Sequence, residues 1–230
     1  MTDSAQRVAV VTGAAGALGD AVLEEFLGSG WTVVALDRPG SRIEDLAARP
    51  GVHAVPVDLA DRAAVCAAFE RVDAAGVPAA LIALAGGFRP SSLADVTQEL
   101  LDEMWRSNVA GLLWCVQHAA PRMASAGGGA VVTVGSRTAL TGPAPVAHAT
   151  SKAAVVRATE LLAEELRPQR IRVNCVLPSV MDTPANRSWM SPDLAARAVP
   201  PAAVAKVIAF LAGPDALPVS GALVPVYGDA

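Results

Sequence analysis

Short apolar segments alternate with longer amphipathic segments along the whole chain. The short segments contain few polar residues, which is typical of strands in a parallel sheet whose two faces are both covered by helices. We expect about seven buried strands, at Val8–Val11, Thr32–Leu36, Val52–Val57, Ala80–Leu84, Ala130–Val134, Ile171–Val176 and Leu223–Val226.

The longer segments repeat their apolar residues at helical spacing. They predict helices at about 17–29, 61–75, 97–123, 147–167 and 201–212. Because strands and helices alternate throughout, we expect an α/β protein with a doubly wound parallel sheet, a Rossmann fold with helices on both faces. No internal repeat or linker interrupts the pattern, so residues 1–230 are predicted to form a single domain.

The composition is that of a globular chain. Hydrophobic residues make up 53% of the 230 residues, which is enough for one large core. No apolar run approaches the roughly 20 residues of a membrane-spanning helix, and the polar start Met1–Arg7 differs from a secretory signal. Cys66, Cys115 and Cys175 lie far apart in apolar surroundings, so we expect buried free thiols and a cytoplasmic protein.

The charged residues argue against a nucleic-acid partner and draw attention to one lysine. The net charge is −4 and the basic residues are scattered, which gives no electrostatic basis for nucleic-acid binding. We expect no metal site either, because the cysteines lack the spacing of metal ligands. The two lysines are far outnumbered by arginines, so Lys152 indicates a position that needs an ammonium group on a flexible stem.

A glycine-rich turn, Thr12–Gly19, follows the first strand and opens the first helix. Its glycines let the backbone bend sharply and approach a pyrophosphate, which the helix N-terminus stabilises. Asp37 ends the second strand, where a carboxylate can bind the ribose hydroxyls of adenosine and repel a 2′-phosphate. NAD(H) is therefore the favoured cofactor, while Arg38 leaves NADP(H) possible because a guanidinium can bind a phosphate.

The segment 136–152 carries the candidate catalytic chemistry. His148 lies one helical turn before Lys152, so both side chains share one face of the predicted helix. Ser136 ends the fifth strand, and Asn108 lies on the long helix that precedes this strand.

These motifs, in this order, resemble the short-chain dehydrogenase/reductase family over nearly the whole chain, from Arg7 to Gly228. The resemblance implies that Ser136 hydrogen-bonds the substrate oxygen and that Asn108 supports a water relay. It implies that Lys152 holds the nicotinamide ribose and lowers the pKa of the neighbouring acid. It further implies a dinucleotide site formed by Gly13, Ala15, Gly16, Leu18, Gly19, Asp37, Arg38, Asp58, Leu59, Ala85, Gly86, Lys152, Pro178, Ser179 and Thr183.

Two features of the family are absent. Ala83 and Leu84 stand where the family has two asparagines, so a side-chain amide that ties this strand to its neighbour is lost. His148 stands where the family has the tyrosine that exchanges a proton with the substrate, and the only tyrosine of the chain is Tyr227.

The change from phenol to imidazole alters the proton chemistry. The ordinary pKa of imidazole is near 6.5, and positive neighbours should lower it further, so His148 is expected to be neutral at pH 7. A neutral imidazole can accept a proton from an alcohol but donates one poorly. Its tip also lies roughly 2 Å closer to the backbone than a phenol oxygen, a gap that a water molecule can bridge.

Three functions are compatible with these residues. The first is an NAD(P)-dependent oxidoreductase for a small apolar carbonyl or alcohol, in which His148 replaces the tyrosine directly or through water. The second is reduction of an activated iminium or enone, or a non-redox reaction, on the same scaffold. The third is a catalytically impaired cofactor-binding protein that acts as a regulator or partner subunit, with His148 as an inert pocket residue.

The substrate is expected to be a small molecule held near a short lid at about 186–199. Phe88, Trp189 and Met190 favour an apolar or aromatic compound, although residues that merely pack a lid have the same character. The family pairs its two long helices across a dimer interface. The resemblance therefore implies a homodimer or homotetramer.

Overall fold

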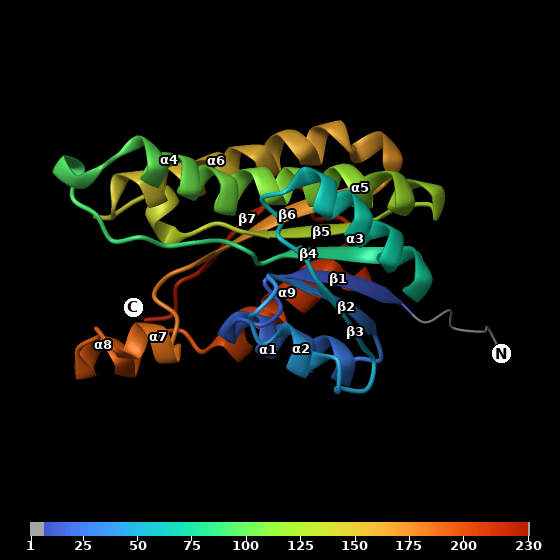
Figure 1. The fold of residues 1–230 in the computed structure, drawn as a ribbon, viewed down its shortest axis with the longest axis horizontal. Helices are drawn as coiled ribbons and strands as arrows, with labels where there is room; N and C mark the ends of the chain where they lie inside the picture. The colour runs from blue at the N-terminus through green and yellow to red at the C-terminus, as the bar shows by residue number, and fades with distance from the viewer. Residues whose placement is uncertain (1–6, 230) are drawn as a thin grey trace.

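A parallel sheet forms the centre of the computed structural model, which describes residues 7–229. Its strands are β1 Val8–Thr12, β2 Thr32–Asp37, β3 Val52–Pro56, β4 Pro78–Ala83, β5 Gly129–Val134, β6 Ile171–Pro178 and β7 Leu223–Val226. Their order across the sheet is β3-β2-β1-β4-β5-β6-β7 (Figure 1), and every neighbouring pair is parallel. All seven predicted strands are confirmed.

Helices cover both faces of this sheet. They are α1 Ala17–Gly28, α2 Ile43–Leu46, α3 Arg62–Ala75, α4 Gln98–Trp105, α5 Gly111–Ser125, α6 Val146–Glu165, α7 Pro184–Arg187, α8 Pro192–Arg197 and α9 Pro201–Ala212. In Figure 1, α3, α4, α5 and α6 lie on one face, and α1, α2 and α9 lie on the other. The predicted single-domain, doubly wound α/β fold is therefore confirmed.

Alternate side chains of each strand enter two separate cores. In β1, Val8 and Val10 pack beneath α3, α5 and α6, whereas Ala9 and Val11 pack against the face covered by α1 and α9. Successive side chains of a strand point to opposite faces, so a strand covered on both faces must be apolar at every position. This requirement explains the uninterrupted apolar runs in the sequence.

The helix predicted at 97–123 consists of two helices joined by a π-helical turn. Helix α4 ends at Trp105, the π turn spans Arg106–Ala110, and α5 continues from Gly111. Such turns insert an extra residue into a helix and are frequent at functional sites. This one carries the buried Asn108.

The three cysteines are free, but the expectation that all are buried is wrong for Cys66. Cys66 is exposed on α3, because this helix buries Val65, Phe69 and Val72 against the sheet and leaves Cys66 outside that stripe. Within residues 7–229, we find no helix with the length and apolar character of a membrane span. The polar start of the chain, residues 1–6, lies outside the described residues.

Candidate active site

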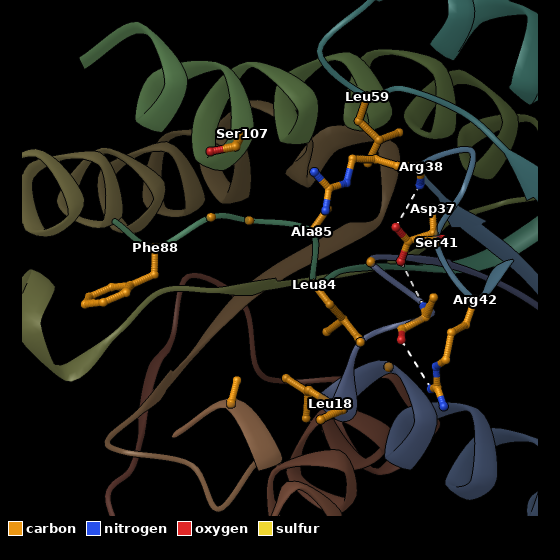
Figure 2. Close-up of a pocket in the computed structure, with 18 of the residues that line it drawn as sticks. Leu18, Asp37, Arg38, Ser41, Arg42, Leu59, Leu84, Ala85, Phe88 and Ser107 are labelled. Carbon is orange, nitrogen blue, oxygen red and sulfur yellow. Dashed lines mark hydrogen bonds between the residues drawn. The ribbon is translucent and has the colours of Figure 1, made fainter. Parts of the chain in front are cut away.

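The order of the strands places a crevice at the carboxyl edge of the sheet. Strand β1 lies between β2 and β4, and the helices that follow β1 and β4 lie on opposite faces, so a gap opens between them. A cleft of about 1170 Å³ occupies this position (Figure 2). Of the residues predicted to hold a dinucleotide, those that line it are Gly13, Ala15, Gly16, Leu18, Gly19, Asp37, Arg38, Asp58, Leu59, Ala85, Gly86 and Thr183.

Glycines bring the first loop of the cleft close to its neighbours. Gly13 has φ +66°, and a Cβ atom there would lie 2.8 Å from the backbone nitrogen of Ala85. The Ala85 nitrogen donates to Thr12 Oγ1 at 3.1 Å, which ties the end of β4 to β1. A Cβ on Gly19 would overlap the Ala14 carbonyl group, so α1 can lie directly against the turn only with glycine here.

The N-terminus of α1 provides hydrogen-bond donors beside the cleft. Gly16 precedes the helix and offers no side chain to cap it. Backbone N–H groups at a helix N-terminus bind phosphate by hydrogen bonds and by the helix dipole. Together with the sharp turn at Gly13, this arrangement fits the pyrophosphate of a dinucleotide.

Asp37 ends β2 at the cleft. Its carboxylate accepts hydrogen bonds from the backbone nitrogens of Ala15 at 2.9 Å and Arg38 at 2.7 Å. The Arg38 side chain extends into the cleft in Figure 2. Sequence analysis missed Arg42, which donates to the Ala15 carbonyl at 3.3 Å and forms an ion pair with Asp20 that raises the Arg42 pKa. Its charge is therefore already engaged, whereas Asp37 places negative charge at the ribose end.

Asp58 and Leu59 follow β3 and lie on the same cleft. Asp58 Oδ1 accepts a hydrogen bond from the Ala60 nitrogen at 2.9 Å and so stabilises a turn. Helix α3 is capped by Asp61 instead, so Asp58 is not its N-cap. Within residues 7–229 Asp58 Oδ2 accepts no hydrogen bond, and it can therefore accept one from a ligand.

Lys152 is buried on α6 beside the end of β4. Its Nζ donates to the Val134 carbonyl oxygen at 2.9 Å. The position that a Cβ on Gly86 would occupy lies 3.2 Å from Lys152 Nζ and 2.6 Å from Asn108 Oδ1, so these two polar groups converge on Gly86. Burial lowers the pKa of Lys152 to about 8. The ammonium group thus lies beside Gly86, which lines the cleft, and the Val134 carbonyl oxygen is its hydrogen-bond partner.

Asn108 joins three elements around this point. Its Oδ1 accepts a hydrogen bond from the Gly87 nitrogen at 2.8 Å, and its Nδ2 donates to the Gly87 carbonyl oxygen at 3.2 Å. Nδ2 also donates to Ser151 Oγ at 2.9 Å, and Ser151 Oγ donates to the His148 carbonyl oxygen at 2.7 Å. Ser151 was not selected from the sequence, because nothing in a residue's spacing shows that it bridges two helices.

His148 faces the segment after β4. It is only 9% exposed, and its ring packs edge-on against Phe88 with the ring centroids 4.9 Å apart. Its Nδ1 is buried and has no hydrogen-bond partner in the described part of the chain. Burial, and then the charge of Lys152, lower the pKa of His148 to about 4. The imidazole is therefore neutral at pH 7, in the direction expected from its positive neighbour.

Ser136 is engaged locally. Its Oγ accepts a hydrogen bond from the Thr138 nitrogen at 3.2 Å and lies 2.8 Å from Thr138 Oγ1, which caps the short 3₁₀ turn Arg137–Ala139. Among residues 7–229, no hydrogen bond joins Ser136 to the His148 ring. The structure thus brings Lys152, Asn108 and Gly86 together, and leaves Ser136 and His148 unconnected.

The remaining predicted residues lie in the segment after β6. Pro178 is the last residue of that strand, and Ser179 Oγ donates to the Tyr227 carbonyl oxygen at 2.6 Å. Thr183 caps α7 by accepting a hydrogen bond from the Asn186 nitrogen, and it also lines the cleft. Only Thr183 of these three faces the cleft, whereas the Ser179 hydroxyl binds the C-terminal segment.

Comparison with known proteins agrees with this arrangement. The sequence profile described as short chain dehydrogenase matches residues 7–193. D-xylose 1-dehydrogenase of Caulobacter vibrioides (strain NA1000 / CB15N) is 32% identical over 222 residues, which cover 90% of this chain and 88% of that protein. 2-(R)-hydroxypropyl-CoM dehydrogenase of Xanthobacter autotrophicus (strain ATCC BAA-1158 / Py2) is 31% identical over 245 residues, with 96% and 97% covered.

A solved structure adds the cofactor class. The 3-ketoacyl-(acyl-carrier-protein) reductase from Brucella melitensis complexed with NADH has a TM-score of 0.89 and 28% identity, and the match covers 96% of this chain and 97% of that one. The glycine turn, the uncapped start of α1 and the buried lysine fit a nicotinamide dinucleotide. The profile and the relatives together show that this chain belongs to the short-chain dehydrogenase/reductase family.

Proposed function

We propose that the protein is an oxidoreductase that binds NAD(H) in preference to NADP(H) and interconverts a small apolar alcohol and its carbonyl compound. The convergence of buried Lys152 and Asn108 on Gly86 carries this proposal. A buried ammonium group with a single carbonyl anchor is costly unless it serves a ligand. A ribose hydroxyl near Gly86 would give it a second partner.

The bound dinucleotide would supply the hydride acceptor or donor. Gly13, Gly16 and the start of α1 would hold its pyrophosphate, and Asp37 its adenosine ribose. The Asp37 carboxylate disfavours a 2′-phosphate at the same place by charge repulsion. This charge is the reason for proposing NAD(H): Arg42 is already paired with Asp20, and Arg38 is, among the described residues, the one cation at this place that would favour NADP(H).

Ser136 and His148 would handle the substrate oxygen. A hydroxyl that now pairs with Thr138 can also donate to a substrate oxygen. The neutral imidazole can accept the alcohol proton, through one water molecule that spans the distance left by its shorter side chain. Because His148 holds almost no proton at pH 7, alcohol oxidation should be less impaired than carbonyl reduction.

A second function is a cofactor-binding protein with little catalysis, which serves as a regulator or partner subunit. The missing link between Ser136 and His148, and the low pKa of His148, favour it. Both functions retain dinucleotide binding. They differ in turnover alone.

Comparison of wild type, His148→Tyr and His148→Ala on a panel of alcohols and carbonyl compounds tests the proposal. If His148 accepts the proton, His148→Ala loses activity by about a hundredfold. If His148→Ala loses nothing and His148→Tyr gains activity, the histidine is not the acid–base group. Calorimetry that detects no binding of either dinucleotide would contradict both functions.

The oligomeric state and the cellular location of the protein are further parts of the proposal. Leu101 and Trp105 on α4 and Leu161 on α6 are exposed apolar residues on the helical layer that the family uses for pairing. We propose a homodimer or homotetramer in the cytoplasm. Sedimentation of the purified protein measures its oligomeric state.

A further inference from the structure

We propose that Phe88 selects the substrate, and that the site takes an alcohol or carbonyl compound whose reacting carbon is attached to an aromatic ring. This inference rests on the proposed function, because it names the substrate class of the same site. It depends on three features of the described residues: the backbone contacts that hold Phe88, the contact of the Phe88 ring with His148, and the apolar side chains at the carboxyl edge of the sheet.

The backbone that carries Phe88 is held on both sides. Asn108 bonds both the nitrogen and the carbonyl oxygen of Gly87, the preceding residue. A Cβ on Gly87 would lie 3.0 Å from Ser107 Oγ and 3.4 Å from Met104 Cε, so the strand end fits closely against the π turn. These contacts hold the backbone at Phe88 in place, so its ring projects from a fixed position.

The Phe88 ring stands between the cleft and the catalytic position. It lines the cleft and packs against the His148 ring at an interplanar angle of 74°. One aromatic side chain in an edge-to-face pair still offers its other surface to a third ring. Phe88 remains 57% exposed despite this contact, so a large apolar surface lies open directly beside the proton-accepting group.

Other large apolar side chains are exposed at the same edge of the sheet. Leu140 follows β5 and is 55% exposed, and Trp189 lies in the lid after β6 and is 57% exposed. Arg89 and Glu103, two charged residues that line the cleft with Phe88, pair with each other at 3.0 Å. Recognition of several sugar hydroxyls requires free polar groups, whereas the exposed Phe88 ring at the cleft favours a flat apolar ring.

Binding of two matched alcohols tests the inference without requiring turnover. The probes are 1-phenylethanol and 1-cyclohexylethanol, which have similar size but differ in aromatic character. Dissociation constants are measured by ligand-observed NMR, with and without NAD. We expect wild type to prefer the phenyl compound by about fivefold, as a ring-to-ring contact provides.

Phe88→Leu keeps an apolar side chain and removes the ring, so it should abolish this preference. Phe210→Leu is the matched control, because Phe210 is also half exposed but lies on α9, near the opposite edge of the sheet, and it should preserve the preference. Absence of a preference in wild type, failure of both alcohols to bind, or a preference that survives in Phe88→Leu would overturn the inference. Ring selectivity without turnover would refute the proposed function and leave this inference standing.

Discussion

The two ends of the cleft are built in different ways. At the proposed nucleotide end, backbone geometry would do most of the binding: Gly13 and Gly19 permit close approaches that a Cβ atom would prevent, and the start of α1 offers its N–H groups. At the proposed catalytic end, side chains carry the chemistry, and the sequence predicts a departure from the family pattern at His148 and Ala83. A site held by backbone tolerates few changes, whereas a site held by side chains can change chemistry one residue at a time.

Removal of the buried ammonium group should have the largest effect. Lys152→Ala leaves the Val134 carbonyl oxygen without its donor and takes away the group beside Gly86, so we expect kcat/KM to fall on the order of a hundredfold. Lys206→Ala, the exposed second lysine on α9, is the control and should behave as wild type. Full activity in Lys152→Ala, with an unchanged melting temperature, would show that the catalytic end does not depend on this residue.

A single methyl group added at Gly13 should weaken the binding of NAD. Gly13→Ala forces alanine into φ +66° and against the Ala85 backbone, so the Kd for NAD should rise by about tenfold or more. Gly28→Ala adds the same group where nothing lies within 4 Å, and it should bind NAD normally. Calorimetric titration of both variants measures the difference. Equal affinities would mean that the loop can move to accommodate the methyl group, and that backbone geometry does not dominate dinucleotide binding.

The charge of Asp37 should decide between the two dinucleotides. Asp37→Asn keeps an oxygen that can accept the Ala15 hydrogen bond but removes the negative charge, so the preference for NAD over NADP should fall by about tenfold. Asp215→Ser, an exposed change elsewhere, should leave the ratio unaltered. A ratio that does not move in Asp37→Asn would assign the preference to another group.

The smallest effect concerns stability at low pH. The pKa of His148 lies near 4 in the folded protein, below its ordinary 6.5, because of burial and the charge of Lys152. Between these two values the unfolded chain takes up a proton that the folded chain refuses, so stability falls as the pH is lowered through this window. His148→Phe removes this titration, and its loss of Tm between pH 7 and pH 5 should be smaller by a few degrees. Identical pH profiles would place the histidine in a more polar setting.

Most residues that the sequence predicts for a dinucleotide site line one cleft, and there is a physical reason for this agreement. Glycine at a sharp turn and an acid at a strand end are local requirements, and local requirements show in spacing. The sequence analysis missed Arg42, because its ion pair with Asp20 joins the segment before α2 to helix α1, which is distant in sequence.

The catalytic end was predicted as a set of residues but not as a connected site. The sequence predicts Ser136, His148 and Lys152 as site residues. The bridge through Ser151 and the contact between Phe88 and His148 depend instead on how α6 meets the segment after β4. Tertiary packing decides such details, and a single sequence carries little record of it.

The π turn at Arg106–Ala110 has a consequence for the helical layer as a whole. One extra residue rotates everything that follows by about 100° around the helix axis. The exposed faces of α4 and α5 are consequently out of phase in the sequence, although α4, the π turn and α5 form one continuous helix. Deleting one residue from the turn would convert it to an α-helical turn and move Asn108 relative to Gly87, whose backbone nitrogen and carbonyl oxygen Asn108 holds. The number of residues in this continuous helix therefore determines the shape of the cleft at Gly87.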